Sequence, residues 1–293
     1  MRLVTQTRFT ADALGDLECI RMLKRAGFDG IDWSFPKTIE ESSTVLFSSS
    51  WKEHALEMKA VADEVGIEFA QAHATYPSST GNDPYDTVIT DRLIRAMECC
   101  SLWGVKNLVI HPVQHLTYAR HAQELFDMNV KFYKELIPHA ERLGVRICTE
   151  NMWQYDAQRG HIVDSVCAPP KEFCALIDAV NSPYLVACLD VGHSALVGYN
   201  IPDFIRLLGK ERLQALHIHD VDYRNDCHTL PFMQKLPWEE ILAALAEIGY
   251  EGDFTYEANC FLQNLPAELM EPACTFMAQT GRYLISRIEA HKQ

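Results

Sequence analysis

The chain has 293 residues, of which 48% are hydrophobic, and a formal net charge of −14. This composition supports a large buried core and excludes a disordered chain, and the acidic balance argues against nucleic acid as a partner. No apolar run is long enough for a membrane span or for the core of a signal peptide. Ten cysteines without a C-x-x-C pair indicate a reduced protein. We therefore expect a cytoplasmic protein with no membrane partner.

The first predicted strand covers Leu3–Thr7, and a repeated pattern of helical segment, glycine and strand follows it. Glycine takes the left-handed conformation at a helix end without strain, so it separates each helix from the next strand. Five copies of this pattern indicate repeating βα units. The copies cover Lys24–Ser34, Asp63–His73, Ser101–His111, Glu141–Glu150 and Ala246–Glu257.

Two further apolar runs, Val186–Asp190 and Leu213–His217, bring the number of predicted strands to eight. An α/β chain of this length with eight such strands fits a single (β/α)8 TIM barrel, and no linker-like segment divides residues 1–293. The alternative is an open, doubly wound sheet. That fold needs a glycine-rich phosphate turn after an early strand, and no G-x-G-x-x-G occurs.

Four long irregular stretches each follow a predicted strand. In a parallel barrel such loops surround the mouth, where they determine which substrate is bound. The stretches are Ser34–Ser49, Thr75–Tyr85, Asn151–Pro170 and Val221–Pro237.

Six of the predicted strands end on a histidine or a carboxylate. The carboxyl ends of parallel barrel strands converge on one mouth, so these side chains should gather into one polar cluster. We therefore predict a metal-centred active site at the mouth. The six strand-end residues are His73, His111, Glu150, Asp190, His217 and Glu257.

The last four of these residues form an oxygen-rich donor set of three carboxylates and one imidazole. Such a set suits Mn²⁺, Mg²⁺ or Co²⁺, and it can also hold Zn²⁺ with positions left open for substrate oxygens. Asp190-Val191-Gly192-His193 adds a second imidazole just past its strand, which can face the same mouth.

These motifs resemble the xylose isomerase-like TIM-barrel superfamily. The resemblance rests on Thr149-Glu150-Asn151, on the Asp190–His193 motif, on His217-Ile218-His219-Asp220 and on Tyr256-Glu257, and it covers nearly the whole chain. The superfamily contains sugar and sugar-phosphate isomerases, ketose 3-epimerases, inosose dehydratase-type enzymes and endonuclease IV.

The similarity to ketose 3-epimerases implies one divalent cation, with Mn²⁺ as the first choice, held by Glu150, Asp190, His217 and Glu257. It also implies a sugar or polyol substrate and a metal-stabilised enediolate, with Glu150 and Glu257 as acid and base. Asp156 and His193 would contact the substrate. The sequence departs from these epimerases at Tyr223, which stands where they carry an arginine, with Arg224 next to it. Self-association into a homo-oligomer is compatible with a barrel of this size.

The similarity to endonuclease IV implies a different use of the histidines. In that alternative a multi-zinc phosphodiesterase adds the ligands His73, His111, His193, Asp226 and His228. The acidic balance and the absence of basic loops argue against a DNA backbone as substrate. In the sugar-enzyme interpretation His73, His111, Arg224 and His228 contact the substrate instead. An inosose dehydratase-type lyase with the same ligands is a further alternative.

Overall fold

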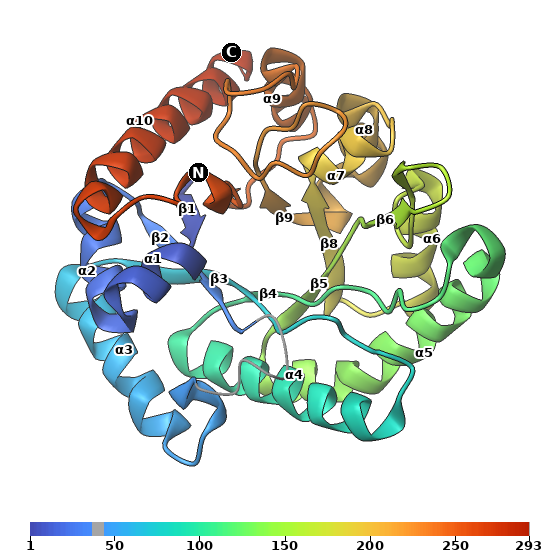
Figure 1. Cartoon of the computed structure of the whole chain (residues 1–293), viewed down its shortest axis with the longest axis horizontal. Helices are drawn as coiled ribbons and strands as arrows, with labels where there is room; N and C mark the ends of the chain where they lie inside the picture. Colours follow the sequence, from blue (N-terminus) through green and yellow to red (C-terminus); the bar gives the residue numbers. More distant parts are fainter. Residues whose placement is uncertain (37–43, 293) are drawn as a thin grey trace.

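Eight parallel strands form one sheet that curls into a barrel with helices around it, as Figure 1 shows. The computed structural model describes residues 1–36 and 44–292, so residues 37–43 of the predicted loop Ser34–Ser49 lie outside the described part. The strands follow the order β10-β1-β2-β3-β4-β5-β8-β9. Their bounds are β1 Leu3–Gln6, β2 Gly30–Ser34, β3 Glu68–His73, β4 Asn107–Val109, β5 Arg146–Glu150, β8 Leu185–Asp190, β9 Leu213–His217 and β10 Phe254–Tyr256.

The barrel closes between β9 and β10 through a single parallel bridge from Ile218 to Tyr256. Ile218 N–H donates to the Thr255 carbonyl at 2.9 Å, and Glu257 N–H donates to the Ile218 carbonyl at 3.1 Å. The predicted (β/α)8 architecture is therefore confirmed.

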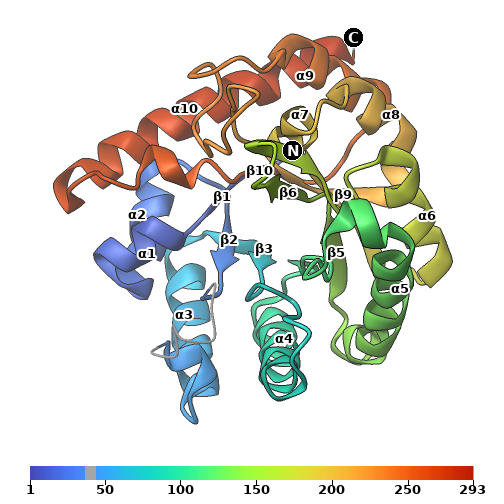
Figure 2. The ribbon, with the colours of Figure 1, turned by 45° about the vertical axis from the view of Figure 1, so that its right-hand side comes forward.

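Helices surround the strands on all sides, as the tilted view of Figure 2 shows. Four of the predicted glycines end their helices with left-handed φ angles of 104°, 73°, 80° and 69°, at Gly27, Gly66, Gly104 and Gly144. No helix within residues 1–36 and 44–292 is both long and apolar enough to cross a membrane. The helices are α1 Arg8–Leu14, α2 Asp16–Ala26, α3 Trp51–Val65, α4 Asp83–Trp103, α5 Tyr118–Leu143, α6 Pro170–Val180, α7 Val191–Leu196, α8 Ile201–Arg212, α9 Trp238–Glu247 and α10 Ala267–His291, with short 3₁₀ turns η1 Val45–Phe47 and η2 Asn259–Phe261.

Alternation along each strand separates two apolar layers. One set of strand residues packs against the helices in the main core; Leu108, Ile147 and Leu216 belong to it. Their neighbours along the strands point into the barrel and form a second buried cluster of small side chains. All ten cysteines of the chain are free thiols. The inner cluster consists of Val109, Cys148, Val186, Cys188 and Ala215.

One of the stretches predicted to be irregular contains a β-hairpin. Within Asn151–Pro170, β6 (Trp153–Asp156) and β7 (His161–Asp164) pair antiparallel around a turn that ends at Gly160, whose φ is 70°. Its strands are four residues long and only partly buried, so they lack the apolar character of the barrel strands. Strand β4 is also shorter than predicted, so His111 lies two residues beyond its end.

Helix α10 seals the seam where β1 and β10 meet. Gly281 faces this seam, and a Cβ atom there would lie 2.4 Å from Leu3 Cδ1 and 3.1 Å from Tyr256 Cε2. Leu3 and Tyr256 are both fully buried. Close packing of the helix on the barrel therefore depends on glycine at this position.

We predict that Gly281→Val lowers the free energy of unfolding by about 2 kcal/mol, because overpacked cores lose about 1–3 kcal/mol. Denaturant-induced unfolding followed by circular dichroism measures this loss. Gln279→Val is the matched control, because it introduces the same side chain at an exposed position of α10. Equal stability of the two variants would contradict the packing argument.

Candidate active site

The site residues continue the inward-facing layer of the barrel at its carboxyl end. Glu150, Asp190 and His217 each lie two residues after a member of the inner apolar cluster on the same strand, so they point the same way. Glu257 follows β10 directly. The structure thus brings together the four side chains that the sequence predicts as metal ligands. One ligand atom from each lies within 4.8 Å of the others.

His217 Nδ1 lies between the two glutamates of this group. It is 3.2 Å from Glu150 Oε2 and 2.9 Å from Glu257 Oε2. Glu150, Asp190 and His217 are fully buried, and Glu257 is 6% exposed. Several of their atoms make no hydrogen bond to any residue of the described ranges, namely both carboxylate oxygens of Glu150, Glu257 Oε2 and both ring nitrogens of His217. Buried polar atoms without partners are rare, and oxygens and one imidazole nitrogen directed at one point fit a hard divalent cation.

The charges of this group depend on one another. Burial favours neutral carboxyls, but His217 and neighbouring histidines hold the pKa values of Glu150 and Glu257 well below their usual range. Burial likewise disfavours a charged His217, but Cys188, Glu257 and Glu150 raise its pKa well above the usual value. The neighbouring histidines therefore favour the ionised form of both glutamates in spite of their burial.

Asp190 is fixed by hydrogen bonds from three sides. Its Oδ1 accepts the backbone N–H of His193 at 2.7 Å and the Nε2–H of His219 at 2.9 Å. The Asn151 side chain binds the backbone N–H and carbonyl of Asp190. Gly192 makes room for His219, because a Cβ atom there would lie 2.1 Å from the His219 ring.

His73 and His111 lie on one side of the four-residue group. Their Nε2 atoms are 2.9 Å apart, and His111 Nε2 is 3.1 Å from Glu150 Oε2. Burial, and next His111, lower the pKa of His73 to about 3, so its ring is neutral. With Glu150, these two residues form a second group whose donor atoms could hold an ion.

A third group collects on the other side, from α7 and the loop after β9. Asp226 Oδ2 is 2.9 Å from His228 Nε2 and 3.5 Å from His193 Nε2, and the His228 ring stacks on His219 with 4.2 Å between ring centres. Burial opposes ionisation of Asp226, but His193 and His228 lower its pKa. Although burial acts against it, Glu257 and Asp226 raise the pKa of His228 to about 9.

Asp32 belongs to the site although sequence reasoning missed it. It is fully buried on β2, its Oδ2 accepts from Gln71 Nε2 at 3.1 Å, and it lies 3.7 Å from His217 Nε2. Burial raises the pKa of this carboxyl. Asp32 stands in the middle of its strand and not at the strand end, where the sequence pattern places the candidate ligands. The signal was an acid inside an otherwise buried strand.

A cavity of about 390 Å³ is lined by residues of all three groups. Tyr76, Trp153 and Phe35 provide apolar walls, and Gln6 and Gln154 provide amide groups, a mixture that suits a small polar ligand. The cavity is large enough for a monosaccharide. Asp156 and Arg224 do not line it. Asp156 instead caps the turn of the hairpin β6–β7 by accepting backbone N–H groups of Gln158 and Arg159.

A larger hollow of about 770 Å³ lies at the opposite, amino-terminal end of the strands. Its charged residues include Arg2, which is ion-paired with Asp253 and Glu68. Catalytic groups of such barrels gather at the carboxyl ends, and the histidines and buried acids lie there. We therefore assign the site to the smaller cavity.

Asp220 organises the loop that carries Asp226 and His228. This fully buried carboxylate accepts N–H groups from Val221, Gln234 and Leu236 and from the indole of Trp238, at 3.0–3.1 Å. It thereby joins the two ends of the loop Val221–Pro237, and this loop is irregular as predicted. The role could not be read from the sequence, because three of the four partners lie 14–18 residues away.

A family model described as Xylose isomerase-like TIM barrel matches residues 20–279. The fructoselysine 3-epimerase of Escherichia coli O157:H7 is 25% identical over 199 residues, which cover 65% of this chain and 70% of that protein. The probable endonuclease 4 of Mycoplasma mobile is 30% identical over 182 residues, 61% of this chain and 60% of that protein. The chain spans between 50% and 70% of the length of the first curated relatives that it matches.

A solved structure of a D-tagatose 3-epimerase-like protein has the same fold. It superposes with a TM-score of 0.77 over 99% of both chains, at 16% sequence identity. The likeness extends over the whole barrel.

We predict that Asp220→Ala loosens the loop Val221–Pro237, because several buried N–H groups lose their acceptor at a cost of about 1–3 kcal/mol. Amide hydrogen exchange of the loop should become faster. Asp222→Ala is the control, since Asp222 accepts only within its own exposed turn, from Arg224 and Asn225. Unchanged protection of the loop in Asp220→Ala would contradict this role.

Proposed function

The chain belongs to the family of xylose isomerase-like TIM barrels, and from this premise we propose that it is a divalent-metal-dependent sugar isomerase or epimerase. The observation that carries the proposal is the buried group of Glu150, Asp190, His217 and Glu257, whose ligand atoms lie within 4.8 Å of one another. Relatives and structural neighbours named as sugar epimerases support the substrate class.

We assign the metal to these four residues. Three carboxylates to one imidazole favour Mn²⁺, with Mg²⁺, Co²⁺ and Zn²⁺ as the alternatives. A bound divalent cation would neutralise the negative charge that develops on the carbonyl oxygen and the adjacent hydroxyl oxygen of the sugar.

Glu150 and Glu257 act as base and acid. One carboxylate removes the proton from the carbon next to the carbonyl, which leaves an enediolate and converts that glutamate into the acid. A proton is returned either by this same glutamic acid or by the second glutamate, once the second glutamate has taken up a proton from solvent. Return to the opposite face of the same carbon gives epimerisation, and return to the neighbouring carbon gives isomerisation. Gln6 supports Glu257 in this role, because it donates to Glu257 Oε1 at 2.9 Å and leaves Oε2 without a hydrogen bond.

The remaining cavity residues bind and orient the sugar. His73 and His111 stand on the Glu150 side, and His193 and His228 stand on the side of Asp226. His193 Nδ1–H donates to the Asn151 carbonyl at 2.9 Å, so Nε2 is the nitrogen that faces the site.

The group of His193, Asp226 and His228 favours a second candidate, a multi-zinc phosphodiesterase of the endonuclease IV type. With His219, these residues could hold a second ion. The net charge of −14 argues for the sugar.

We predict that Glu150→Gln and Glu257→Gln each lower turnover at least about 100-fold, because a positioned acid or base contributes about 10²–10⁴-fold. The measurement is solvent deuterium incorporation beside the carbonyl of a panel of free ketoses, followed by NMR. Glu141→Gln, on the exposed face of α5, is the control. Near wild-type exchange in either site variant would refute the two-acid mechanism. Loss of water from a polyol would indicate the lyase, and cleavage of abasic DNA by the zinc-loaded protein would indicate the nuclease.

We predict that Asp32→Asn weakens divalent-metal binding about 10- to 100-fold, the usual effect of removing a carboxylate that supports a ligand histidine, because a negative charge 3.7 Å from His217 Nε2 is lost. Calorimetric titration with Mn²⁺ measures the affinity. The free energy of unfolding is compared with and without Mn²⁺, and the deficit should be larger when the ion is present. Equal affinity for the variant and the wild type would exclude an orienting role for Asp32.

A further inference from the structure

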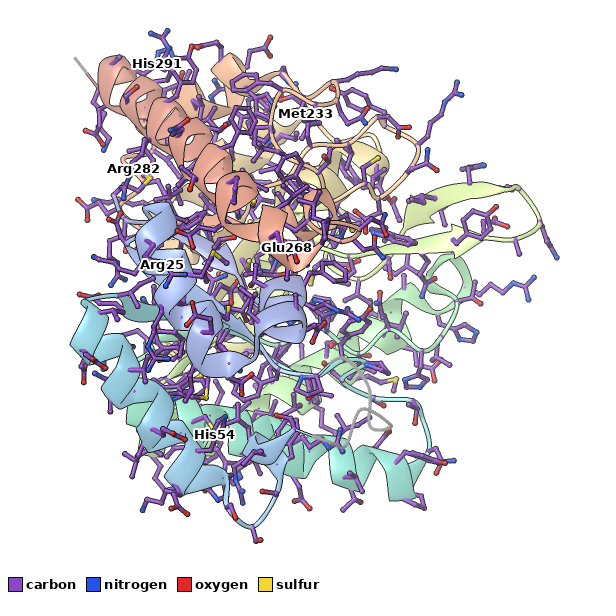
Figure 3. The ribbon with its side chains drawn as sticks, turned by 60° about the vertical axis from the view of Figure 1, so that its left-hand side comes forward. Arg25, His54, Met233, Glu268, Arg282 and His291 are labelled. Atoms are coloured by element: carbon purple, nitrogen blue, oxygen red, sulfur yellow. The ribbon has the colours of Figure 1, made fainter. Side chains whose placement is uncertain are left out.

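A second hollow, of about 1290 Å³, lies beside the cavity of the candidate active site. The two spaces share Gln154 and Tyr155 in their walls, and Gln114 of the cavity is followed in the chain by His115 of the hollow. We call this space the hairpin hollow, because most residues of the hairpin β6–β7 line it. Figure 3 shows the hairpin projecting from the barrel at the right. A ligand that fills the cavity can therefore extend into the hairpin hollow.

One face of the hairpin leads from the cavity into the hairpin hollow. Side chains alternate along a strand, so Trp153 and Tyr155 lie on the same face of β6. Their partners on β7, Asp164 and Ile162, share that face. Trp153 lines the cavity, where its Nε1–H donates to Asp226 Oδ2 at 3.2 Å. Tyr155 lines both spaces, and Ile162 and Asp164 line the hairpin hollow. This face thus forms one surface that runs outwards from the site.

The opposite face of the hairpin is fixed to the barrel through Gln154. The side-chain amide nitrogen of Gln154 donates to the carbonyls of Gln114 at 3.0 Å and Leu116 at 2.7 Å. Its amide oxygen accepts the backbone N–H of Tyr118 at 2.9 Å. These hydrogen bonds tie the hairpin to the loop after β4. The outward-running face is therefore in place before a ligand binds, which lowers the cost of ordering it.

Two exposed tyrosines stand in the hairpin hollow. Tyr155 is 62% exposed and Tyr223 is 46% exposed. Tyr223 takes a φ of 66°, which is uncommon for an aromatic residue and marks a position that the surrounding structure holds in place. It is also the position at which the sequence departs from the ketose 3-epimerases. Leu196 and Val197 add apolar surface. Tyrosine offers an apolar ring face and a polar hydroxyl tip at once.

The charges of the hairpin hollow are balanced. Apart from two histidines, the charged side chains that line it in the described ranges are Arg120, Arg159, Asp156 and Asp164. Arg159 Nε lies 3.5 Å from Asp156 Oδ2, and Asp164 Oδ2 accepts the Tyr199 hydroxyl at 3.2 Å. Phosphate and carboxylate groups are bound where cations dominate. Equal numbers of arginines and aspartates therefore favour an uncharged group here.

We propose that the substrate is a ketose that carries a second, uncharged sugar ring, with the ketose in the cavity and the second ring in the hairpin hollow. A pyranose ring has an apolar face of C–H groups and hydroxyls at its edge, which match the ring faces and hydroxyl tips of Tyr155 and Tyr223. The inference rests on the proposed isomerase or epimerase function and narrows its substrate class to glycosylated ketoses.

The test compares D-fructose with isomaltulose and maltulose, in which the same ketose carries a glucose ring on O6 or O4, and with fructose 6-phosphate. The measurement is kcat/KM of the Mn²⁺-loaded protein for solvent deuterium incorporation beside the carbonyl, followed by NMR. At least one disaccharide should exceed fructose by about 10-fold, the gain expected from stacking on an aromatic ring. Fructose 6-phosphate should not exceed fructose.

Tyr155→Ala and Tyr223→Ala should each lower kcat/KM for the preferred disaccharide about 10-fold more than for fructose, because the second ring loses an aromatic contact. Tyr85→Ala is the matched control. Tyr85 is 55% exposed on α4 and lines neither space, so its removal should leave the ratio between the two sugars unchanged.

The outcomes separate this inference from the proposed function. Fructose that equals or exceeds both disaccharides, or tyrosine substitutions that affect both kinds of sugar equally, would overturn the inference and leave the isomerase or epimerase in place. A preference for fructose 6-phosphate would also overturn it, because the hairpin hollow would then take an anion. Absence of exchange with every sugar would instead refute the proposed function on which the inference rests.

Discussion

Buried acids and histidines at the barrel mouth compensate one another's charges. The rest of the structure depends on this constraint. One carboxylate oxygen each of Glu150, Asp190 and Glu257 lies within 4.8 Å of a ring nitrogen of His217. All four residues are buried, with at most 6% of their surface exposed. Buried charges of one sign are costly unless an opposite charge compensates them. Although burial acts against it, neighbouring groups raise the pKa values of His193 and His217. These imidazoles can therefore supply the compensating charge, and so can a divalent cation. The same site therefore favours both ionised bases and cation binding.

Hydrogen bonds from neighbouring residues hold these acids in place and offset part of the cost of burying their charges. Asp190 is held by Asn151, His193 and His219, and Glu257 is held by Gln6, which in turn accepts from Asn259 at 2.9 Å. These contacts come from strands and turns far apart in the sequence. They leave the remaining oxygens close together at one point of the mouth.

The sequence predicted those parts of the site that follow from strand periodicity alone. The four proposed ligand positions could be found because each ends or directly follows a buried strand, and parallel strands end at a common mouth. Asp32 and Asp220 could not be found this way, since their importance lies in partners on other elements. The sugar-enzyme interpretation made Asp156 and Arg224 substrate contacts, but neither lines the cavity. Loop conformation determines where such residues point, and periodicity carries no information about it.

The loop Val221–Pro237 connects the barrel, the cavity and the outer surface of the molecule. Asp220 joins its ends, Asp226 and His228 in its middle face the cavity, and Phe232 and Met233 beyond them face outwards. Only three residues separate His228 from Phe232, and the fully buried Leu230 lies between them. The group formed by His193, Asp226 and His228 distinguishes a sugar site from a multi-ion phosphodiester site. Whatever restrains the outer side of the loop therefore also restrains the geometry that decides between these two chemistries.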